Sequence, residues 1–329
     1  MTTVLVLAEQ DADGLLDSSL RAMTFARGLG EGGALAVAVA GEPQAPAALA
    51  STAGEYGAAQ LFVMALSGYA PLAWARALHT LAASLGADVV VAPGTDHGNE
   101  IMAHLGAING EEMVANCFAG ERMGSGSWQL SRHRWGGSLF EDARLDAKQA
   151  LLTVATDAVA PEPAPASWPH SGPAEVHEYE PELSGGDEAV VASESREQAG
   201  GVSLANARVV VSGGRGVGGA EGFSVIEELA ANLGGAVGVS RAVTSLGWRP
   251  HSEQVGQTGT RVTPDLYLAC GISGAIQHLA GCQSAKTMIA INTDPDAPIM
   301  NRADYAVIGD VNEILPVLLA ALRARSQPC

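Results

Sequence analysis

The chain has 329 residues, and its 36 acidic and 18 basic residues give a formal net charge of −18 at pH 7. A nucleic-acid binder needs a basic surface to replace the counterions around phosphate, so this charge argues against a nucleic-acid partner. Hydrophobic residues make up 47% of the sequence, glycine is frequent at 40 residues, and aromatic residues are only 5%. This composition favours an α/β fold of two domains with small core side chains and many tight turns.

Targeting, disulfide and metal-binding patterns are lacking in the sequence. The chain enters the strand-like run Val4–Leu7 without a basic leader, and no apolar run reaches the roughly 18 residues of a membrane helix. We therefore expect a cytoplasmic protein with no direct membrane insertion. No C-x-x-C pattern occurs among the cysteines, which favours a reducing compartment; they are Cys117, Cys270, Cys282 and Cys329. Metal-ligand spacing is also lacking at His97, His104 and His133, so we expect no metal.

Strands and helices alternate through the first part of the chain. The predicted strands are Val4–Leu7, Leu35–Val39, Leu61–Met64 and Asp88–Ala92, and the predicted helices are Leu15–Leu29, Ala45–Tyr56, Leu72–Leu85 and Glu100–Ala107. This order is typical of βαβ units and predicts a Rossmann-like parallel sheet. Period-2 patterns then predict added strands, for which we consider an antiparallel arrangement; they are Trp128–Arg132, Leu139–Leu145 and Leu151–Ala155. Together these elements predict an N-terminal domain over residues 1–160.

A proline-rich acidic segment follows this domain. Six of the sixteen prolines lie between Pro161 and Pro181, and nine acidic residues face one basic residue between Glu162 and Glu197. Such a composition cannot form a core of its own. We predict a solvated linker over residues 161–204 and a C-terminal Rossmann-like domain over residues 205–329.

The C-terminal domain begins with a strand, a glycine-rich turn and a helix. The strand Arg208–Val211 leads into the turn Ser212–Gly219 and the helix Phe223–Leu233. The turn matches G-x-G-x-x-G at Gly214, Gly216 and Gly219. This pattern lets a backbone approach a pyrophosphate and presents N–H groups at a helix N-terminus.

An NAD site is disfavoured by the residues that follow this turn. An acidic residue is expected about 20 positions on to bind the ribose, but the sequence there reads Val239-Ser-Arg-Ala242. Arg215 and Arg241 instead offer two cations to an anionic ligand, such as a multi-phosphate or a reduced flavin.

Polar residues recur where later strands end. The loop Pro250–Gly259 carries Gln254, Gln257 and Thr258, which suit the edge of a heteroaromatic ring, although a plain connector stays open. The predicted strands Leu266–Cys270, Met288–Asn292 and Tyr305–Ile308 precede a terminal helix Glu313–Arg325. Because parallel strands end at one edge, we expect a cleft lined by the residues that follow them; these are Arg215, Ser240, Ser273, Asn292 and Asp310.

Five motifs of this domain resemble the α subunit of electron transfer flavoproteins. They follow the order and spacing of that family over about residues 205–320. They are Val209–Gly216, Ser240–Ala242, Gln254–Gly259, Gly271–Gly281 and Ala290–Ile299.

The resemblance implies an FAD held mainly by the C-terminal domain, in a heterodimer with a β subunit that carries AMP or a second FAD. It implies a redox carrier without substrate turnover of its own. It further implies that electrons come from flavin dehydrogenases of the acyl-CoA type or similar and pass to a quinone oxidoreductase.

The resemblance also implies a set of FAD-binding residues. Among them Arg241 is implied to lie against the isoalloxazine, Thr258 near its N5 and His278 near its O2, where charge and donors tune the flavin. The full set is Arg215, Ser240, Arg241, Val255, Gly256, Gln257, Thr258, Ser273, Gly274, Ala275, Ile276, Gln277, His278, Asn292, Asp310 and Val311.

Two other functions fit parts of the pattern. One is an NADP-dependent oxidoreductase that binds the 2′-phosphate with Arg215 and Arg241 and uses His278 as its only candidate general acid or base. The other is a nucleotide-sensing module in which the loop Ala92–His97 binds an adenine nucleotide without redox chemistry.

Overall fold

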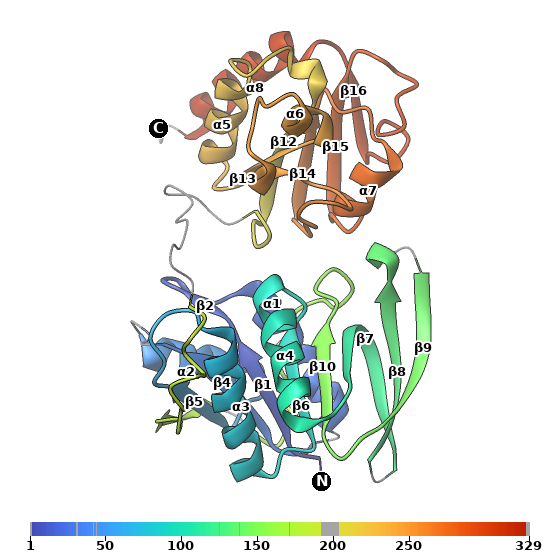
Figure 1. Cartoon of the computed structure of the whole chain (residues 1–329). Helices are drawn as coiled ribbons and strands as arrows, with labels where there is room; N and C mark the ends of the chain where they lie inside the picture. The colour runs from blue at the N-terminus through green and yellow to red at the C-terminus, as the bar shows by residue number, and fades with distance from the viewer. Residues whose placement is uncertain are drawn as a thin grey trace. The chain divides into compact units, whose positions relative to one another are not determined.

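The computed structural model of the chain describes residues 2–30, 32–41, 43, 45–124, 126–137, 139–170, 172–191 and 204–326. The chain divides into two compact units, Met1–Ser195 and Arg196–Cys329 (Figure 1). Both units are α/β, as predicted.

A nine-stranded sheet forms the centre of the N-terminal unit. Its strands, in spatial order, are β11 (Glu175–Tyr179), β5 (Gln60–Met64), β4 (Leu35–Ala40), β1 (Val4–Ala8), β6 (Val89–Pro93), β10 (Ala150–Val154), β7 (Met113–Gly124), β8 (Ser127–Arg134) and β9 (Leu139–Asp146). Neighbours are parallel from β11 to β7, and β8 and β9 are antiparallel. A small hairpin pairs β2 (Gln10–Asp11) with β3 (Gly14–Leu15). The antiparallel arrangement that we considered is thus confirmed for β8 and β9 and wrong for β10.

Two hydrophobic cores lie on the two faces of this sheet. Alternate residues of β1 enter different cores: Val4 and Val6 enter one, and Leu5 and Leu7 enter the other. This explains why the strand reads as a continuous apolar run, as expected of a parallel strand buried on both faces. The helices that cover the sheet are α1 (Asp17–Gly30), α2 (Pro46–Glu55), α3 (Pro71–Leu85) and α4 (Asp96–Asn109).

The structure corrects the predicted linker over its first part. β11 pairs in parallel with β5 at the sheet edge, and Trp168 Nε1 donates to the Gly57 carbonyl at 2.8 Å. The segment needs no core of its own because it docks onto an existing one, where Ala174 is buried. The predicted linker residues 192–203 lie outside the described residues.

The C-terminal unit is built on a five-stranded parallel sheet. Its strands, in spatial order, are β13 (Ala236–Val239), β12 (Val209–Gly213), β14 (Leu266–Cys270), β15 (Thr287–Asn292) and β16 (Tyr305–Ile308). The first strand lies between the second and third, as in doubly wound sheets whose ligand binds where the chain direction switches. That switch point lies between β12 and β14. Sequence patterns missed β13, whose four residues, Ala-Val-Gly-Val, are too short a run to stand out.

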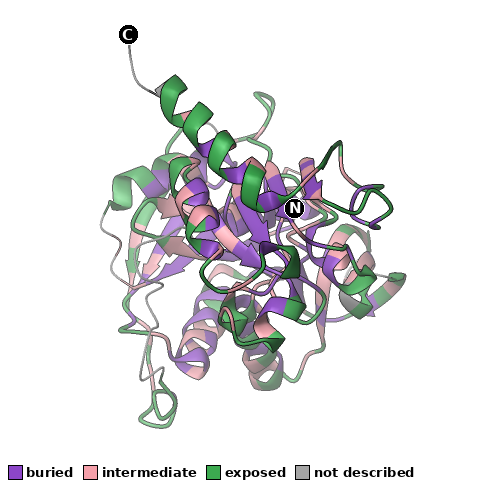
Figure 2. Ribbon diagram, turned by 90° about the horizontal axis from the view of Figure 1, so that it is seen from above, coloured by how far each residue is buried: buried purple, intermediate pink, exposed green. Residues whose placement is uncertain are grey.

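The helices of this unit flank the sheet, and their outward faces are exposed (Figure 2). They are α5 (Phe223–Asn232), α6 (Arg241–Ser245), α7 (Ile276–Cys282) and α8 (Val311–Ser326), with 3-10 turns η2 (Arg215–Val217) and η3 (His251–Glu253). Phe223, Ile226 and Leu315 pack from α5 and α8 onto one face of the sheet. Within the described ranges of both units, no helix has both the length and the apolar character to cross a membrane.

Candidate cofactor site

The carboxyl ends of the five parallel strands of the C-terminal unit meet at one edge. This edge brings together the residues that follow each strand, because all five strands run in the same direction. The residues are Arg215 after β12, Ser240 and Arg241 after β13, Ser273–His278 after β14, Asn292 at the end of β15 and Asp310 after β16.

The glycine-rich turn joins two loops at the switch point. The Gly214 amide donates to the Cys270 carbonyl at 2.8 Å, and the Gly216 amide donates to the Gly271 carbonyl at 3.0 Å. A Cβ on Gly214 would lie only 2.3 Å from the Gly271 oxygen. We expected these glycines to present N–H groups to a pyrophosphate. The structure corrects this for Gly214 and Gly216, because their amides already donate hydrogen bonds to Cys270 at the end of β14 and to Gly271 in the loop after it.

Two arginines are exposed at this edge. Arg215 lies in η2, and Arg241 is the first residue of α6, directly after the buried Ser240. Neither guanidinium forms an ion pair with a residue in the part of the chain that the structure describes. Both cations are therefore available to an anionic ligand.

The loop after α6 is anchored at both ends. The Val255 amide donates to the Val239 carbonyl at 2.9 Å, and the Gln257 amide donates to the Gln277 carbonyl at 2.7 Å. Gly256 has a φ of 146°, which suits glycine. Gln257 and Thr258 are exposed, whereas Val255 and Gln254 are buried.

This geometry corrects one expectation. We expected the Gln254 side chain to face a ring edge, but it is only 2% exposed and turns into the protein.

The loop after β14 approaches another segment closely. A Cβ on Gly274, whose φ is +82°, would lie 2.4 Å from the Ile299 amide nitrogen. The Ile299 amide donates to the Ser273 carbonyl at 3.2 Å. This close approach leaves Ser273 and the three residues Ala275, Ile276 and Gln277 exposed at the start of α7.

His278 lies inside the C-terminal unit. Its Nε2 is 2.9 Å from the Tyr267 hydroxyl, and its Nδ1 is buried without a partner of standard hydrogen-bond geometry. Burial lowers the pKa of His278 to about 4, and the Val255 backbone opposes this only in part. The imidazole is therefore neutral at pH 7 and points into the core rather than joining the exposed side chains of the edge.

Three further residues of the implied set have roles within the fold. Asn292 Nδ2 donates to the Ile272 carbonyl at 2.8 Å, which holds the loop after β14. Asp310 Oδ1 accepts from the Asn312 amide at 2.9 Å, so it caps α8. Val311 is buried in the core.

A salt-bridge cluster that the sequence analysis missed supports the loop. Arg249 contacts Glu253 through Nε at 2.7 Å and Nη2 at 2.8 Å, and it pairs with Glu227 on α5. Its guanidinium lies 5.7 Å from the Phe223 ring centroid. The i,i+4 spacing of Arg249 and Glu253 was the available signal.

At the corresponding edge of the N-terminal unit, Glu9 contacts the start of α4. Thr95 is the N-cap of α4, accepts from the Gly98 amide at 2.9 Å and donates its hydroxyl to the Glu9 carboxylate. The Gly98 backbone also bonds Glu9, whose pKa is raised mainly by burial. The Thr95 hydroxyl and the Gly98 backbone at the start of α4 are therefore already bonded to Glu9, which disfavours the nucleotide-sensing alternative.

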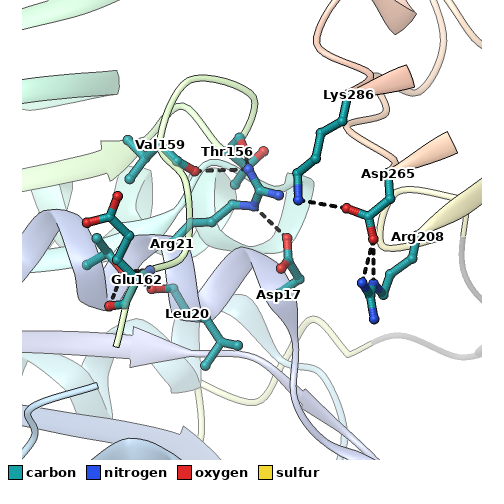
Figure 3. A network of polar contacts seen from close by, with 10 residues as sticks. Asp17, Leu20, Arg21, Thr156, Val159, Glu162, Arg208, Asp265 and Lys286 are labelled. Carbon is teal, nitrogen blue, oxygen red and sulfur yellow. Dashed lines mark hydrogen bonds and ion pairs between the residues drawn. The ribbon is translucent and has the colours of Figure 1, made fainter. Parts of the chain in front are cut away.

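Polar networks elsewhere secure each unit separately (Figure 3). In the N-terminal unit, Arg21 donates to the carbonyls of Thr156 at 2.8 Å and Val159 at 2.9 Å, which ties α1 to the segment after β10. In the C-terminal unit, Asp265 binds Arg208 and Lys286 at the amino ends of the strands, the edge opposite to the candidate site. These are structural contacts.

Two family models and several curated proteins match this chain. The model of the electron transfer flavoprotein FAD-binding domain matches residues 203–283, and that of the electron transfer flavoprotein domain matches residues 4–184. The electron transfer flavoprotein subunit alpha of Mycobacterium tuberculosis is 38% identical over 329 residues, 99% of each chain. That of Thermoanaerobacterium thermosaccharolyticum is 35% identical over 259 residues, 78% of each chain. That of Paracoccus denitrificans is 56% identical over 119 residues, 36% of this chain and 39% of its own.

A doubly wound domain whose ligand edge carries two exposed arginines, with no ion-pair partner among the described residues, defines a protein that binds a nucleotide-type cofactor. The chain belongs to the electron transfer flavoprotein α-subunit family. Its cofactor is FAD, it is a redox carrier, and an α subunit implies a β-subunit partner. The predicted family, fold class and cofactor are confirmed.

The side chains at the edge fit FAD chemically. Arg215 and Arg241 supply positive charge for a pyrophosphate or a reduced ring, and the Thr258 hydroxyl and the exposed Gln257 supply neutral hydrogen-bonding groups.

Proposed function

We propose that this chain is the FAD-binding subunit of a heterodimeric electron carrier. It accepts electrons from flavin dehydrogenases, of the acyl-CoA type or similar, and passes them to a quinone oxidoreductase. Its β subunit carries AMP or a second FAD, and the chain itself turns over no substrate. The three described cysteines are free and buried, which supports a place in the reducing cytoplasm.

The main observation behind this proposal is that Arg215 and Arg241 have no ion-pair partner among the described residues and belong to the same sheet edge as the anchored polar loop at residues 255–258. FAD, when bound, supplies the redox chemistry. Arg215 and Arg241 stabilise negative charge on it, and Thr258 offers a hydroxyl. The implied FAD-binding set stays a proposal, in which His278, Asn292 and Val311 act by shaping the edge or through their backbones.

The alternative function, an NADP-dependent oxidoreductase, lacks a side chain that could act as its general acid or base. His278 was its only candidate, and this side chain is buried against Tyr267 with a pKa lowered to about 4. A general acid or base must reach the substrate and titrate near the working pH, so no observation favours this function.

The test is an absorption spectrum of the chain purified with a co-expressed β subunit, followed by anaerobic reductive titration. We expect flavin bands that bleach on reduction and one FAD released per heterodimer from this chain's site. A colourless heterodimer that added FAD does not reconstitute would overturn the proposal. Arg215→Ala should weaken FAD retention on gel filtration, whereas Arg208→Ala, at the opposite edge, serves as the matched control.

A further inference from the structure

The side chain of Gln254 is a buried amide that connects the loop to α6. Its Oε1 lies 2.6 Å from the Thr244 hydroxyl of α6, and its Nε2 lies 3.1 Å from both the carbonyl and the hydroxyl of Thr258. With only 2% of its surface exposed, Gln254 satisfies its amide entirely through these two threonines.

The contacts determine which way the amide points. The Thr258 carbonyl can only accept a hydrogen bond, so the amide atom facing it must be the nitrogen. A flipped amide would place two acceptors against each other at that contact and lose the bond. The nitrogen has two hydrogens, and the second reaches the Thr258 hydroxyl oxygen.

This orientation has a consequence for Thr258. A hydroxyl that accepts from the protein interior keeps its own hydrogen for another partner. Thr258 is exposed at the loop surface, so that hydrogen is available to a ligand. The hydroxyl is thereby held as a donor.

The same amide also reaches the helix that begins with Arg241. The Thr244 hydroxyl, besides its contact with Gln254, lies 3.0 Å from the Arg241 carbonyl. The Gln254 backbone is fixed as well, because its carbonyl accepts from the Thr260 amide at 2.7 Å. Gln254 therefore links Thr258 to the helix that begins with Arg241.

We propose that Gln254 is a positioning residue that holds the Thr258 hydroxyl as a hydrogen-bond donor toward FAD. This inference rests on the proposed function. Gln254 itself does not touch the cofactor; it determines the direction of the Thr258 hydrogen bond and so the preference of the site for one-electron-reduced, negatively charged FAD over oxidised FAD.

The test is a double-mutant cycle on the midpoint potential of FAD in the co-expressed heterodimer. Thr258→Val removes the hydroxyl. Gln254→Glu replaces the inner donor with a carboxylate acceptor, which turns the Thr258 hydrogen inward. We expect each single change to lower the affinity for one-electron-reduced, negatively charged FAD relative to oxidised FAD by about fivefold, as for the loss of one hydrogen bond, and thus to lower the potential of the first electron. In the Thr258→Val background, Gln254→Glu should shift the potential by less than in the wild-type background, because only the added negative charge of the carboxylate then acts.

Gln283→Glu, an exposed glutamine at the end of α7, is the matched control and should leave the potential unchanged. An unchanged potential in Gln254→Glu, or a shift of equal size in the wild-type and Thr258→Val backgrounds, would overturn the inference. A potential unchanged by Thr258→Val would do the same, because no donor would then exist to be positioned.

Thr244→Val keeps the experiment decisive if Gln254→Glu does not fold. It removes the contact that orients Oε1 and should shift the potential in the same direction by a smaller factor; no shift would count against the inference. Failure of the wild-type heterodimer to bind FAD is a separate result, which would overturn the proposed function instead.

Discussion

Tyr267 and His278 share a hydrogen bond of 2.9 Å between the phenol oxygen and Nε2, inside the C-terminal unit. Burial raises the pKa of Tyr267 well above its usual value and lowers the pKa of His278 to about 4. Both groups are therefore neutral at pH 7, and the pair is a polar contact of the core.

The neutral state of His278 predicts a loss of stability in mild acid. The unfolded chain takes up the proton near pH 6.5, whereas the folded chain resists it until about pH 4. The contribution is thus complete above pH 6.5 and is lost as the pH falls toward 4, by up to about 3 kcal/mol. Urea unfolding at pH 7, 6 and 5 measures this. His278→Gln should have a flatter profile, and parallel profiles for the two proteins would refute the prediction.

Substitution by alanine should lower the free energy of unfolding by different amounts at Gly214 and at Gly218. Gly214 has an ordinary φ of −110°, but a Cβ there would meet the Gly271 carbonyl oxygen at 2.3 Å. Gly214→Ala must separate the two loops, and we expect a loss of about 3 kcal/mol in the free energy of unfolding together with reduced FAD content.

Gly218 is the matched control for this steric effect. Its φ is +93°, and no described atom lies within 4 Å of the position that a Cβ would take. Gly218→Ala should cost only about 1 kcal/mol, from backbone strain. Equal losses in the two variants, measured by urea unfolding, would show that the loop contact is not tight.

The Arg241 guanidinium is exposed and has no ion-pair partner among the described residues. We therefore expect its removal to change the redox potential of FAD rather than the stability of the fold. Arg241→Ala should retain FAD but disfavour its reduced, negatively charged form by about 1 kcal/mol, or roughly 45 mV for one electron. Spectroelectrochemical titration measures this. Arg208→Ala removes a cation from the opposite edge and should change the potential little. The shift should shrink at high salt because an exposed charge is screened.

Glu9 in the N-terminal unit should make stability depend on pH in the direction opposite to His278. Burial raises the pKa of this carboxyl above 4.5 in the folded state. The folded chain then binds the extra proton, so the Glu9 contribution falls as the pH rises through the raised pKa. Wild type should lose stability relative to Glu9→Gln between pH 4.5 and 7. A constant difference in urea midpoint would contradict this.

Local sequence patterns predicted most helices and strands, but not which strands lie next to one another in the sheet. The period of the apolar residues indicated β1, β4, β5 and β6 with their helices, because burial on both faces leaves a local signature. The apolar pattern could not place β10 between β6 and β7, because the residues of one strand do not specify which strands it pairs with. β11 was missed because its residues are largely exposed and its pairing with β5 joins distant segments.

The sequence by itself determined the family, the cofactor class and the polar residues that follow each strand, because glycine spacing and motif order are local properties. Only the tertiary structure decided which of those polar groups are exposed at the edge of the sheet and which bond to other parts of the fold. The amides of Gly214 and Gly216 bond another loop, His278 pairs with Tyr267, and Gln254 turns inward to Thr258. The physical reason is that a buried polar group must find its partner within the fold, and these partners come from segments that only folding brings together.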